Sequence, residues 1–346
     1  MAVIEDIRAR AKQLLEGGKV RAVLGYRRST AGLLAEPAFI TAPEDAESLV
    51  MDATCVENLA LYLVNEKKRL KATRSTETKP LAIVAKGCDS RTINILLQEN
   101  YIGRDEVVIL GVSCGTGGVI DTRKLNGALR GKAATAAVFD GAGAGAVNIT
   151  LMNGETSVPA ADALAARCLE CSQAYPDGSD FFFGEKASER AYSPRFATLS
   201  AFAEKSMDER SAFWAGHFER CIRCYACRAV CPMCYCDECV VDSTSSIVDP
   251  STSADDKANR ICWIQRSAAP SESAMYHMVR AMHLAGRCSD CGECERVCPV
   301  NIPLRLLNNL LEHEALEAFG CAPGVDPSQP SLISSFRDGD PNEFIR

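Results

Sequence analysis

Two copies of one cysteine motif constrain this chain more than any other sequence feature. Each copy spells C-x2-C-x2-C-x3-C-P, and the copies cover residues 221–232 and 288–299. This spacing is typical of proteins with two [4Fe–4S] clusters, because three thiolates on a tight loop wrap three corners of a cubane and the fourth reaches the other cluster. We therefore expect one cluster on Cys221, Cys224, Cys227 and Cys298, and a second on Cys288, Cys291, Cys294 and Cys231.

Zinc is the alternative metal for these motifs, since C-x2-C pairs also build tetrahedral zinc sites. Each block satisfies the iron–sulfur spacing in full, which favours the clusters. The chain has 18 cysteines and 4 histidines, so thiolate ligation dominates over a histidine-rich zinc or di-iron site. His277 and His283 are off the i, i+4 spacing, and we interpret them as core or surface residues and not as haem ligands.

A further group of cysteines follows the first motif directly. Cys234, Cys236 and Cys239 lie close together in the sequence, and Cys262 follows a polar loop. Together they would supply the ligands of a further metal site. The alternative is that some of them are small buried hydrophobic residues beside the clusters, as free cysteines often are.

The N-terminal part of the chain contributes another set of four cysteines. Cys88 and Cys114 each follow an apolar run that predicts a strand, and Cys168 and Cys171 form a C-x2-C pair. Because open α/β sheets bind ligands at the carboxyl ends of their strands, we expect this set to hold a third [4Fe–4S] cluster. The alternative is two buried structural cysteines and a redox-inert pair. Cys55 and Cys321 have no partner by spacing and are interpreted as structural.

Hydrophobic patterning predicts an α/β N-terminal domain with a mainly parallel sheet. Helical spacing predicts helices over residues 4–18 and 57–72, joined by a loop. Apolar runs at 80–86 and 106–112 flank a helix at 89–100, with Asp89 as its N-cap candidate, as in a parallel βαβ unit. Further apolar runs at 135–139 and 146–151 extend this interpretation to about residue 160.

A change in composition after residue 160 predicts the domain organisation. We expect an α/β domain over 1–180, a helical connector over 181–215, an α+β dicluster ferredoxin-like domain with helical flanks over 216–310, and a C-terminal helix and tail over 311–346. A stretch rich in Ser, Asp and Thr predicts a loop, 240–270, inserted between the two motifs. Helices are expected over 196–220, 271–287 and 302–320.

Two glycine-rich segments are candidates for cofactor binding. Gly115, Gly117 and Gly118 follow a predicted strand and Cys114, where they would shape a flavin or cluster pocket; a plain turn is the alternative. Gly141, Gly143 and Gly145 lack the full G-x-G-x-x-G pattern and are interpreted as a flexible turn.

Charge and hydropathy exclude several function classes. With 38 Lys+Arg against 45 Asp+Glu the formal net charge is −7, which argues against phosphate contacts with a nucleic acid. The sequence contains no run of about 18 apolar residues, and its N-terminus lacks the pattern of a signal peptide. We therefore expect a cytoplasmic protein without a transmembrane segment, whose close-spaced cysteines serve metal or redox chemistry.

Two parts of the chain resemble known families. Residues 215–310, which carry both motifs, resemble a bacterial-type dicluster ferredoxin domain. Residues 80–121 resemble the α/β domain of the coenzyme F420 hydrogenase/dehydrogenase beta-subunit family, through Lys86-Gly-Cys88, the helix after it and the strand that ends at Cys114-Gly. The second resemblance implies an iron–sulfur protein that carries electrons between a hydrogenase or formate dehydrogenase and a flavin or deazaflavin, with related chains in heterodisulfide-reductase-type complexes.

We therefore expect an electron-transfer subunit of an anaerobic multi-subunit oxidoreductase, with at least two and by our count three [4Fe–4S] clusters. Its acidic surface would favour docking on a basic patch of a partner subunit. We find no flavin or F420 fingerprint and assign no catalytic residue. One alternative is a flavin- or F420-dependent oxidoreductase with its own pocket in the α/β domain. Another is a cluster-carrying assembly or sensing protein whose partner affinity depends on the state of its clusters.

Overall fold

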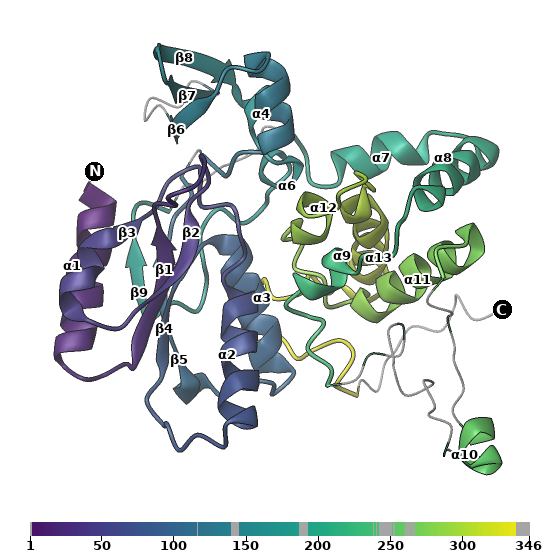
Figure 1. Ribbon diagram of the computed structural model, residues 1–346, viewed down its shortest axis with the longest axis horizontal. Helices are drawn as coiled ribbons and strands as arrows, with labels where there is room; N and C mark the ends of the chain where they lie inside the picture. The colour runs from purple at the N-terminus through teal and green to yellow at the C-terminus, as the bar shows by residue number, and fades with distance from the viewer. Residues whose placement is uncertain are drawn as a thin grey trace. The chain divides into compact units, whose positions relative to one another are not determined.

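The computed structural model describes residues 2–115, 117–139, 145–186, 193–237, 239, 241, 251, 253–259, 264 and 267–336 (Figure 1). These residues divide into two compact units. The first unit comprises Met1–Ala197, Ser289–Cys291 and Ala322–Asp338, and the second includes Thr198–Cys288 and Gly292–Cys321.

The first unit is built on a six-stranded sheet with mostly parallel neighbours, which confirms the expected α/β domain. Along the sheet the order is β2-β1-β4-β5-β9, and β3 pairs with β1. The pairs β1–β4, β4–β5 and β5–β9 are parallel, whereas β2 and β3 run antiparallel to β1. The strands are β1 (Ala22–Arg27), β2 (Glu36–Ile40), β3 (Leu49–Val50), β4 (Leu81–Ala85), β5 (Val107–Val112) and β9 (Phe181–Phe183).

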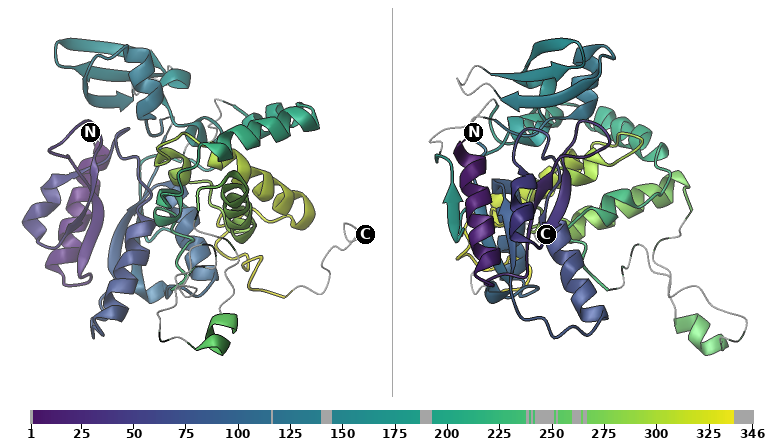
Figure 2. Two further views of the ribbon diagram at one scale, coloured as in Figure 1. Left: turned by 45° about the vertical axis from the view of Figure 1, so that its right-hand side comes forward. Right: turned by 60° about the vertical axis from the view of Figure 1, so that its left-hand side comes forward.

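Helices cover both faces of this sheet (Figures 1 and 2). On one face, α1 (Ala2–Glu16) packs Ile7, Ala11 and Leu14 against strand residues that include Val84 and Leu110. The other face is covered by α2 (Ala60–Ala72) and α3 (Gly87–Gln98). With both faces covered, every residue of β4 is buried, which explains its continuous apolar sequence.

The segment between α1 and α2 differs from the loop that we expected. It forms β1, β2, β3 and a 3-10 turn at Pro43–Ser48. The expectation was wrong because β1 lies inside the sheet and is almost fully buried, so its sequence lacks the alternation of a half-exposed strand. Both flanking helices are confirmed.

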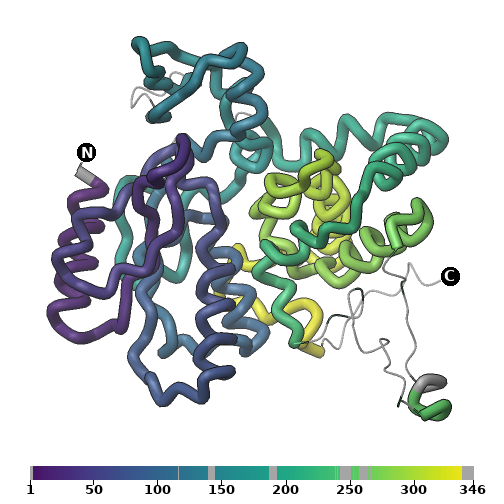
Figure 3. Tube along the Cα trace, in the orientation of Figure 1, coloured from purple at the N-terminus to yellow at the C-terminus, as the bar shows by residue number. Residues whose placement is uncertain are grey.

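A second, three-stranded sheet lies between β5 and β9 in the chain, and the tube in Figure 3 follows the chain out to it and back. It is an antiparallel meander of β6 (Ala134–Phe139), β7 (Ala146–Leu151) and β8 (Gly154–Pro159), and it packs with α4 (Thr122–Leu129) and α5 (Ala160–Ala163). Our expectation that these runs continue the parallel sheet was wrong. The physical reason is that parallel neighbours need a long crossover, whereas residues 140–145 and 152–153 are short connections.

In the second unit the described residues form helices and loops and no strand. The helices are α7 (Ala197–Ala203), α8 (Met207–Glu219), α9 (Ala226–Ala229), α10 (Ala254–Asn259), α11 (Pro270–Leu284), α12 (Glu293–Arg296) and α13 (Leu304–Phe319). The α+β character that we expected for this domain is therefore not seen in its described part. Most of the expected inserted loop lies outside the described residues.

The helix expected over 196–220 is divided in two. A break separates α7 from α8, and Ser206 starts α8 with a capping box in which Ser206 and Glu209 bond to each other's backbone N–H. The expected helices at 271–287 and 302–320 are confirmed as α11 and α13. Within the described ranges, no helix is long and apolar enough to span a membrane.

Candidate functional site

The two cysteine motifs adopt the same backbone conformation. In the first motif Arg223 and Tyr225 have positive φ angles of 53° and 60°, and at the equivalent positions of the second motif Asp290 and Gly292 have 53° and 66°. Three of these four residues are not glycine, so each of the three bears the cost of a left-handed conformation. Alternating conformations of this kind turn successive N–H groups to one side of a loop, as in many iron–sulfur sites.

The backbone hydrogen bonds of the two motifs also repeat. After each left-handed residue a short helix begins, α9 in the first motif and α12 in the second. The N–H of Cys231 donates to the carbonyl of Arg228 at 3.1 Å, and the N–H of Cys298 donates to that of Glu295 at 3.2 Å. The fourth cysteine of each motif is therefore held at the end of the same short helix.

Cysteines of both motifs contribute to one apolar core of the second unit. The core includes Cys221 and Cys227 from the first motif and Cys294 and Cys298 from the second. Of the remaining motif cysteines, Cys224 is exposed, and Cys231, Cys288 and Cys291 are half-buried. A backbone that wraps thiols around a loop and buries several of them fits the ligands of a [4Fe–4S] cluster.

Buried polar groups surround the first motif. Arg280 on α11 is buried and donates to the carbonyl of Cys227 at 3.1 Å, with the Cys234 sulfur at 3.9 Å. A hydrogen bond with Cys231 and the charge of Arg280 lower the pKa of Cys234 to about 5. Burial, with Arg280 and Arg223 nearby, lowers the pKa of His277 to about 3. His277 is thus a core residue, whereas His283 is exposed.

The further metal site expected on Cys234, Cys236, Cys239 and Cys262 stays a prediction. Cys234 and Cys239 are half-buried, Cys236 is exposed, and Cys262 lies outside the described residues. In the part of the chain that the structure describes, no three Cys, His, Asp or Glu side chains approach closely enough to hold a metal ion. A cubane carries one thiolate at each of four iron corners, so its ligands lie farther apart than those of a single ion.

The four cysteines of the N-terminal part line one pocket of the first unit, together with basic side chains. Its lining includes Cys88, Cys114, Cys168, Cys171, Lys86, Arg91, Arg167, Arg195, Gly118, Ser289 and Asp290. The lining is rich in cationic side chains, of which Arg195 pairs with Asp290 at 2.9 Å and Lys86 pairs with Asp89 at 3.1 Å. A basic lining of this kind suits thiolates or another anionic group. The pocket therefore brings together all the cysteines that we expected to hold a third cluster.

The sheet explains how two of these cysteines meet. Cys88 lies in the first turn of α3, directly after β4, and Cys114 follows β5. Because β4 and β5 are parallel neighbours, their carboxyl ends lie at the same edge of the sheet. Cys168 belongs to α6 (Ala166–Leu169), and its sulfur accepts the N–H of Val119 at 3.4 Å.

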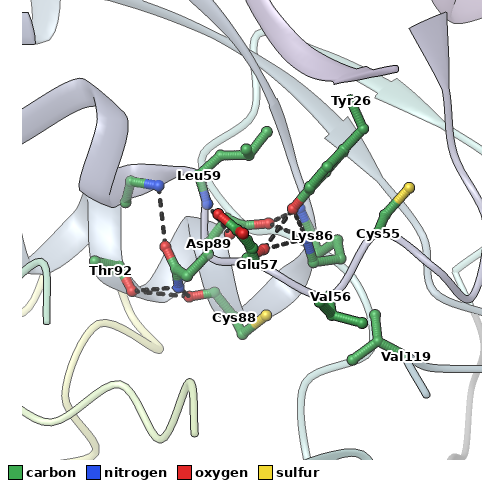
Figure 4. Close-up of polar contacts among 12 residues, drawn as sticks. Tyr26, Cys55, Val56, Glu57, Leu59, Lys86, Cys88, Asp89, Thr92 and Val119 are labelled. Carbon is green, nitrogen blue, oxygen red and sulfur yellow. Dashed lines mark hydrogen bonds and ion pairs between the residues drawn. The ribbon is translucent and has the colours of Figure 1, made fainter. Parts of the chain in front are cut away.

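The lining of this pocket includes a buried lysine, Lys86, which we did not predict as a site residue (Figure 4). Lys86 is 2% exposed, and its ammonium lies 3.1 Å from the Asp89 carboxylate and 3.0 Å from the Glu57 carbonyl. It also donates to the Tyr26 hydroxyl. Burial opposes the charge of Lys86, but Asp89 and the nearby Cys88 outweigh it and raise its pKa. In the sequence, the signal that could have identified Lys86 was its position as a single lysine at the end of an apolar run.

Cys55 and Cys321 are buried, and burial with Asp52 beside it raises the pKa of Cys55 to about 12. The N–H of Gly117 donates to the Cys114 carbonyl at 3.0 Å, closing the turn after β5. The predicted turn at 141–145 lies outside the described residues except for Gly145.

Comparison with known proteins finds relatives along almost the whole chain. No family profile matches the chain. Over 93% of its length, the chain is 22% identical to a curated protein of Methanocaldococcus jannaschii, and the match covers 92% of that relative. It is 24% identical, again over 93% of its length, to a curated protein of Methanococcus maripaludis, of which the match covers 91%. Both relatives are beta subunits of F420-dependent enzymes by name, so the resemblance to F420-linked beta subunits is confirmed.

Both relatives carry a specific name. They are the "F420-dependent formate dehydrogenase subunit beta" of M. jannaschii and the "F420-dependent formate dehydrogenase 1 subunit beta" of M. maripaludis, and the chain is similar to both along almost its whole length. A solved structure of the F420-reducing [NiFe] hydrogenase complex from Methanosarcina barkeri matches with a TM-score of 0.35 and 13% identity, over 49% of this chain and 58% of that one. The resemblance of residues 215–310 to a ferredoxin domain stays a prediction.

Proposed function

We propose that this chain is an iron–sulfur electron-transfer subunit of a multi-subunit oxidoreductase. The observation that carries the proposal is the repeated motif conformation, in which Arg223 and Tyr225 match Asp290 and Gly292 in positive φ. The same energetically costly backbone conformation occurs at both predicted ligand loops, which indicates that the two loops have the same function. Their cysteine spacing is typical of loops that bind a [4Fe–4S] cluster.

The residues around the motifs would hold and tune the clusters. When bound, a [4Fe–4S] cluster supplies one-electron redox chemistry. The loops place Cys227 and Cys298 in an apolar core, which would keep water away from a cluster bound there. The buried Arg280 beside the first motif offsets part of the negative charge that thiolates bring.

We propose a third cluster in the pocket of the first unit, on Cys88, Cys114, Cys168 and Cys171. The convergence of these cysteines with Lys86, Arg91, Arg167 and Arg195 supports this assignment. Together with the motif clusters it would extend the relay into the α/β domain.

Removing one ligand tests the third cluster. The variant Cys168→Ser should lose about four iron atoms per chain and keep the spectra of the two motif clusters. Cys55→Ala is the matched control, because Cys55 is buried in the same unit but is not assigned to any cluster. An unchanged iron content of Cys168→Ser would contradict the third cluster without affecting the assignment of the two motif clusters.

The relatives suggest the kind of partner. Both are subunits of formate dehydrogenases by name, so we propose that this chain assembles with the other subunits of a formate dehydrogenase, hydrogenase or heterodisulfide-reductase type of complex. The net charge of −7 would favour a basic docking patch on the partner.

A second candidate function is a flavin- or F420-dependent oxidoreductase with its own substrate pocket. The observation that favours it is the basic lining of the same pocket, by Arg91, Arg167 and Arg195, which suits an anionic cofactor. Cofactor analysis of protein purified without oxygen discriminates the two functions. A stoichiometric yellow cofactor released on denaturation supports the flavin- or F420-dependent oxidoreductase, and iron with sulfide alone supports the electron-transfer subunit.

A further inference from the structure

One helix turn of α11 contacts two sulfurs of the first motif. Tyr276 and His277 are adjacent on this helix and are 1% and 2% exposed. The Tyr276 hydroxyl lies 3.6 Å from the Cys227 sulfur, and Nε2 of His277 lies 3.3 Å from the Cys221 sulfur. Both cysteines are assigned above to the same cluster.

We propose that Tyr276 and His277 are hydrogen-bond donors to the thiolates of Cys227 and Cys221 and raise the reduction potential of the cluster that these thiolates hold. The inference rests on the proposed function, because it requires a cluster on the first motif. It makes Tyr276 and His277 positioning residues that act on the cluster through its ligands.

The direction of both hydrogen bonds follows from the chemistry of an iron-bound cysteine. A ligating thiolate carries no proton, so its sulfur only accepts. The Tyr276 hydroxyl is then the donor, and Nε2 of His277 carries the ring proton. In the described residues Nδ1 of His277 is buried without a hydrogen-bond partner. A proton there would be unsatisfied, which favours the neutral tautomer with its proton on Nε2.

Packing holds the two side chains in these positions. The His277 ring stacks on Phe218, with centroids 5.0 Å apart and planes 13° apart. Tyr276 meets Tyr225 edge to face at 5.4 Å. Rings fixed in this way do not have to become ordered when the hydrogen bonds form, so the donors are preorganised.

A donor to sulfur stabilises the reduced cluster more than the oxidised one. Reduction adds one negative charge to the cluster and its thiolates, and a hydrogen bond to an acceptor strengthens as the acceptor becomes more negative. The Ile302 N–H adds a backbone donor, at 3.4 Å from the sulfur of Cys298. The side-chain donors are the ones that substitution can remove.

The test is a potentiometric titration of the full-length holo-protein, prepared without oxygen and followed by electron paramagnetic resonance. Tyr276→Phe removes only a hydroxyl, and His277→Phe removes the ring N–H while keeping a ring against Phe218. We expect each substitution to shift the midpoint potential of one cluster to more negative values. The expected size is roughly a threefold to tenfold change in the ratio of reduced to oxidised cluster at fixed potential, or up to about 59 mV for a one-electron couple.

His283→Phe is the matched control, because it makes the same chemical change at an exposed position of the same helix. It should leave both potentials unchanged, and His277→Gln, which restores an N–H, should recover part of the shift. If His277→Phe does not fold, Tyr276→Phe decides the question. Clusters whose potentials do not respond to Tyr276→Phe, or which all shift equally, would overturn the inference. Protein without [4Fe–4S] signals would instead overturn the proposed function.

Discussion

At the scale of single residues, Lys86 is a buried cation that depends on its partners. Its ammonium and the Asp89 carboxylate are 2% and 0% exposed and lie 3.1 Å apart. A buried pair of this kind adds little net stability compared with apolar residues, but loss of one partner leaves an uncompensated charge in the core. The network also joins β1, through Tyr26, to the residues that lead into Cys88.

Lys86→Met should therefore destabilise the first unit strongly. We expect a loss of about 3 kcal/mol or more, because Asp89 would remain buried without its cation. Hydrogen exchange of the α3 amides measures this loss in the full-length protein.

The control is Lys67→Met, because Lys67 pairs with Glu106 at 2.7 Å but both side chains are partly exposed. Its effect should stay below about 1 kcal/mol. Lys86→Met with Asp89→Asn should recover part of the lost protection, because no buried charge remains and the amide oxygen still accepts a backbone N–H. Equal effects of Lys86→Met and Lys67→Met would contradict the buried-pair argument.

The residues of the candidate sites were unequally predictable. Spacing alone pointed to Cys221, Cys227 and the other motif cysteines, because cluster ligation imposes a local pattern. Spacing also grouped Cys168 with Cys171, and strand ends grouped Cys88 with Cys114. Tyr276, His277 and Arg280 reach the first motif from a helix about 50 positions further along the chain, so no local pattern could assign them.

At the scale of elements, the start of α3 shows where local rules fall short. We expected Asp89 to be the N-cap, but the helix begins at Gly87 and Asp89 occupies the third helical position. There its carboxylate accepts the backbone N–H of Lys86 at 2.9 Å. The helix begins earlier because β4 leads into it directly, and this brings Cys88 into the first turn.

Gly87 is required at this junction. A Cβ at Gly87 would lie 2.2 Å from the Gln173 carbonyl oxygen, which belongs to the backbone and cannot rotate away. Gly87→Ala should therefore cost about 1–3 kcal/mol and displace Cys88. Urea unfolding and iron analysis of the same preparation measure both effects.

Gly127→Ala is the matched control for that substitution. Gly127 lies within α4, and a Cβ there would meet nothing within 4 Å. Alanine should stabilise this helix by about 0.5–1 kcal/mol. A neutral or stabilising Gly87→Ala would contradict the close approach between α3 and residue 173.

At the scale of the whole molecule, patterning predicted the class of the first domain and several helices but not the order of the sheet. Strand β9 pairs with β5 although about 70 residues, including the meander, separate them in the chain. The segment after α13 also returns to the first unit, where Arg91 donates to the Pro323 carbonyl at 3.0 Å. Contacts between such distant parts depend on tertiary packing, which a single sequence does not encode as a local pattern.

The same limit applied to the second unit. A ferredoxin-like α+β domain was the expectation from the two motifs, yet their described surroundings are helical. The motif constrains the loop that would hold a cluster, as the matching φ angles of Arg223 and Asp290 illustrate, and leaves the supporting elements open.

The most direct test of the account is the iron and acid-labile sulfide content of the full-length protein purified without oxygen. We predict about 12 iron and about 12 sulfide atoms per chain, from two motif clusters and one cluster in the pocket of the first unit. About 8 of each would restrict the relay to the two motifs. Zinc in place of iron, with no labile sulfide, would contradict the electron-transfer function itself.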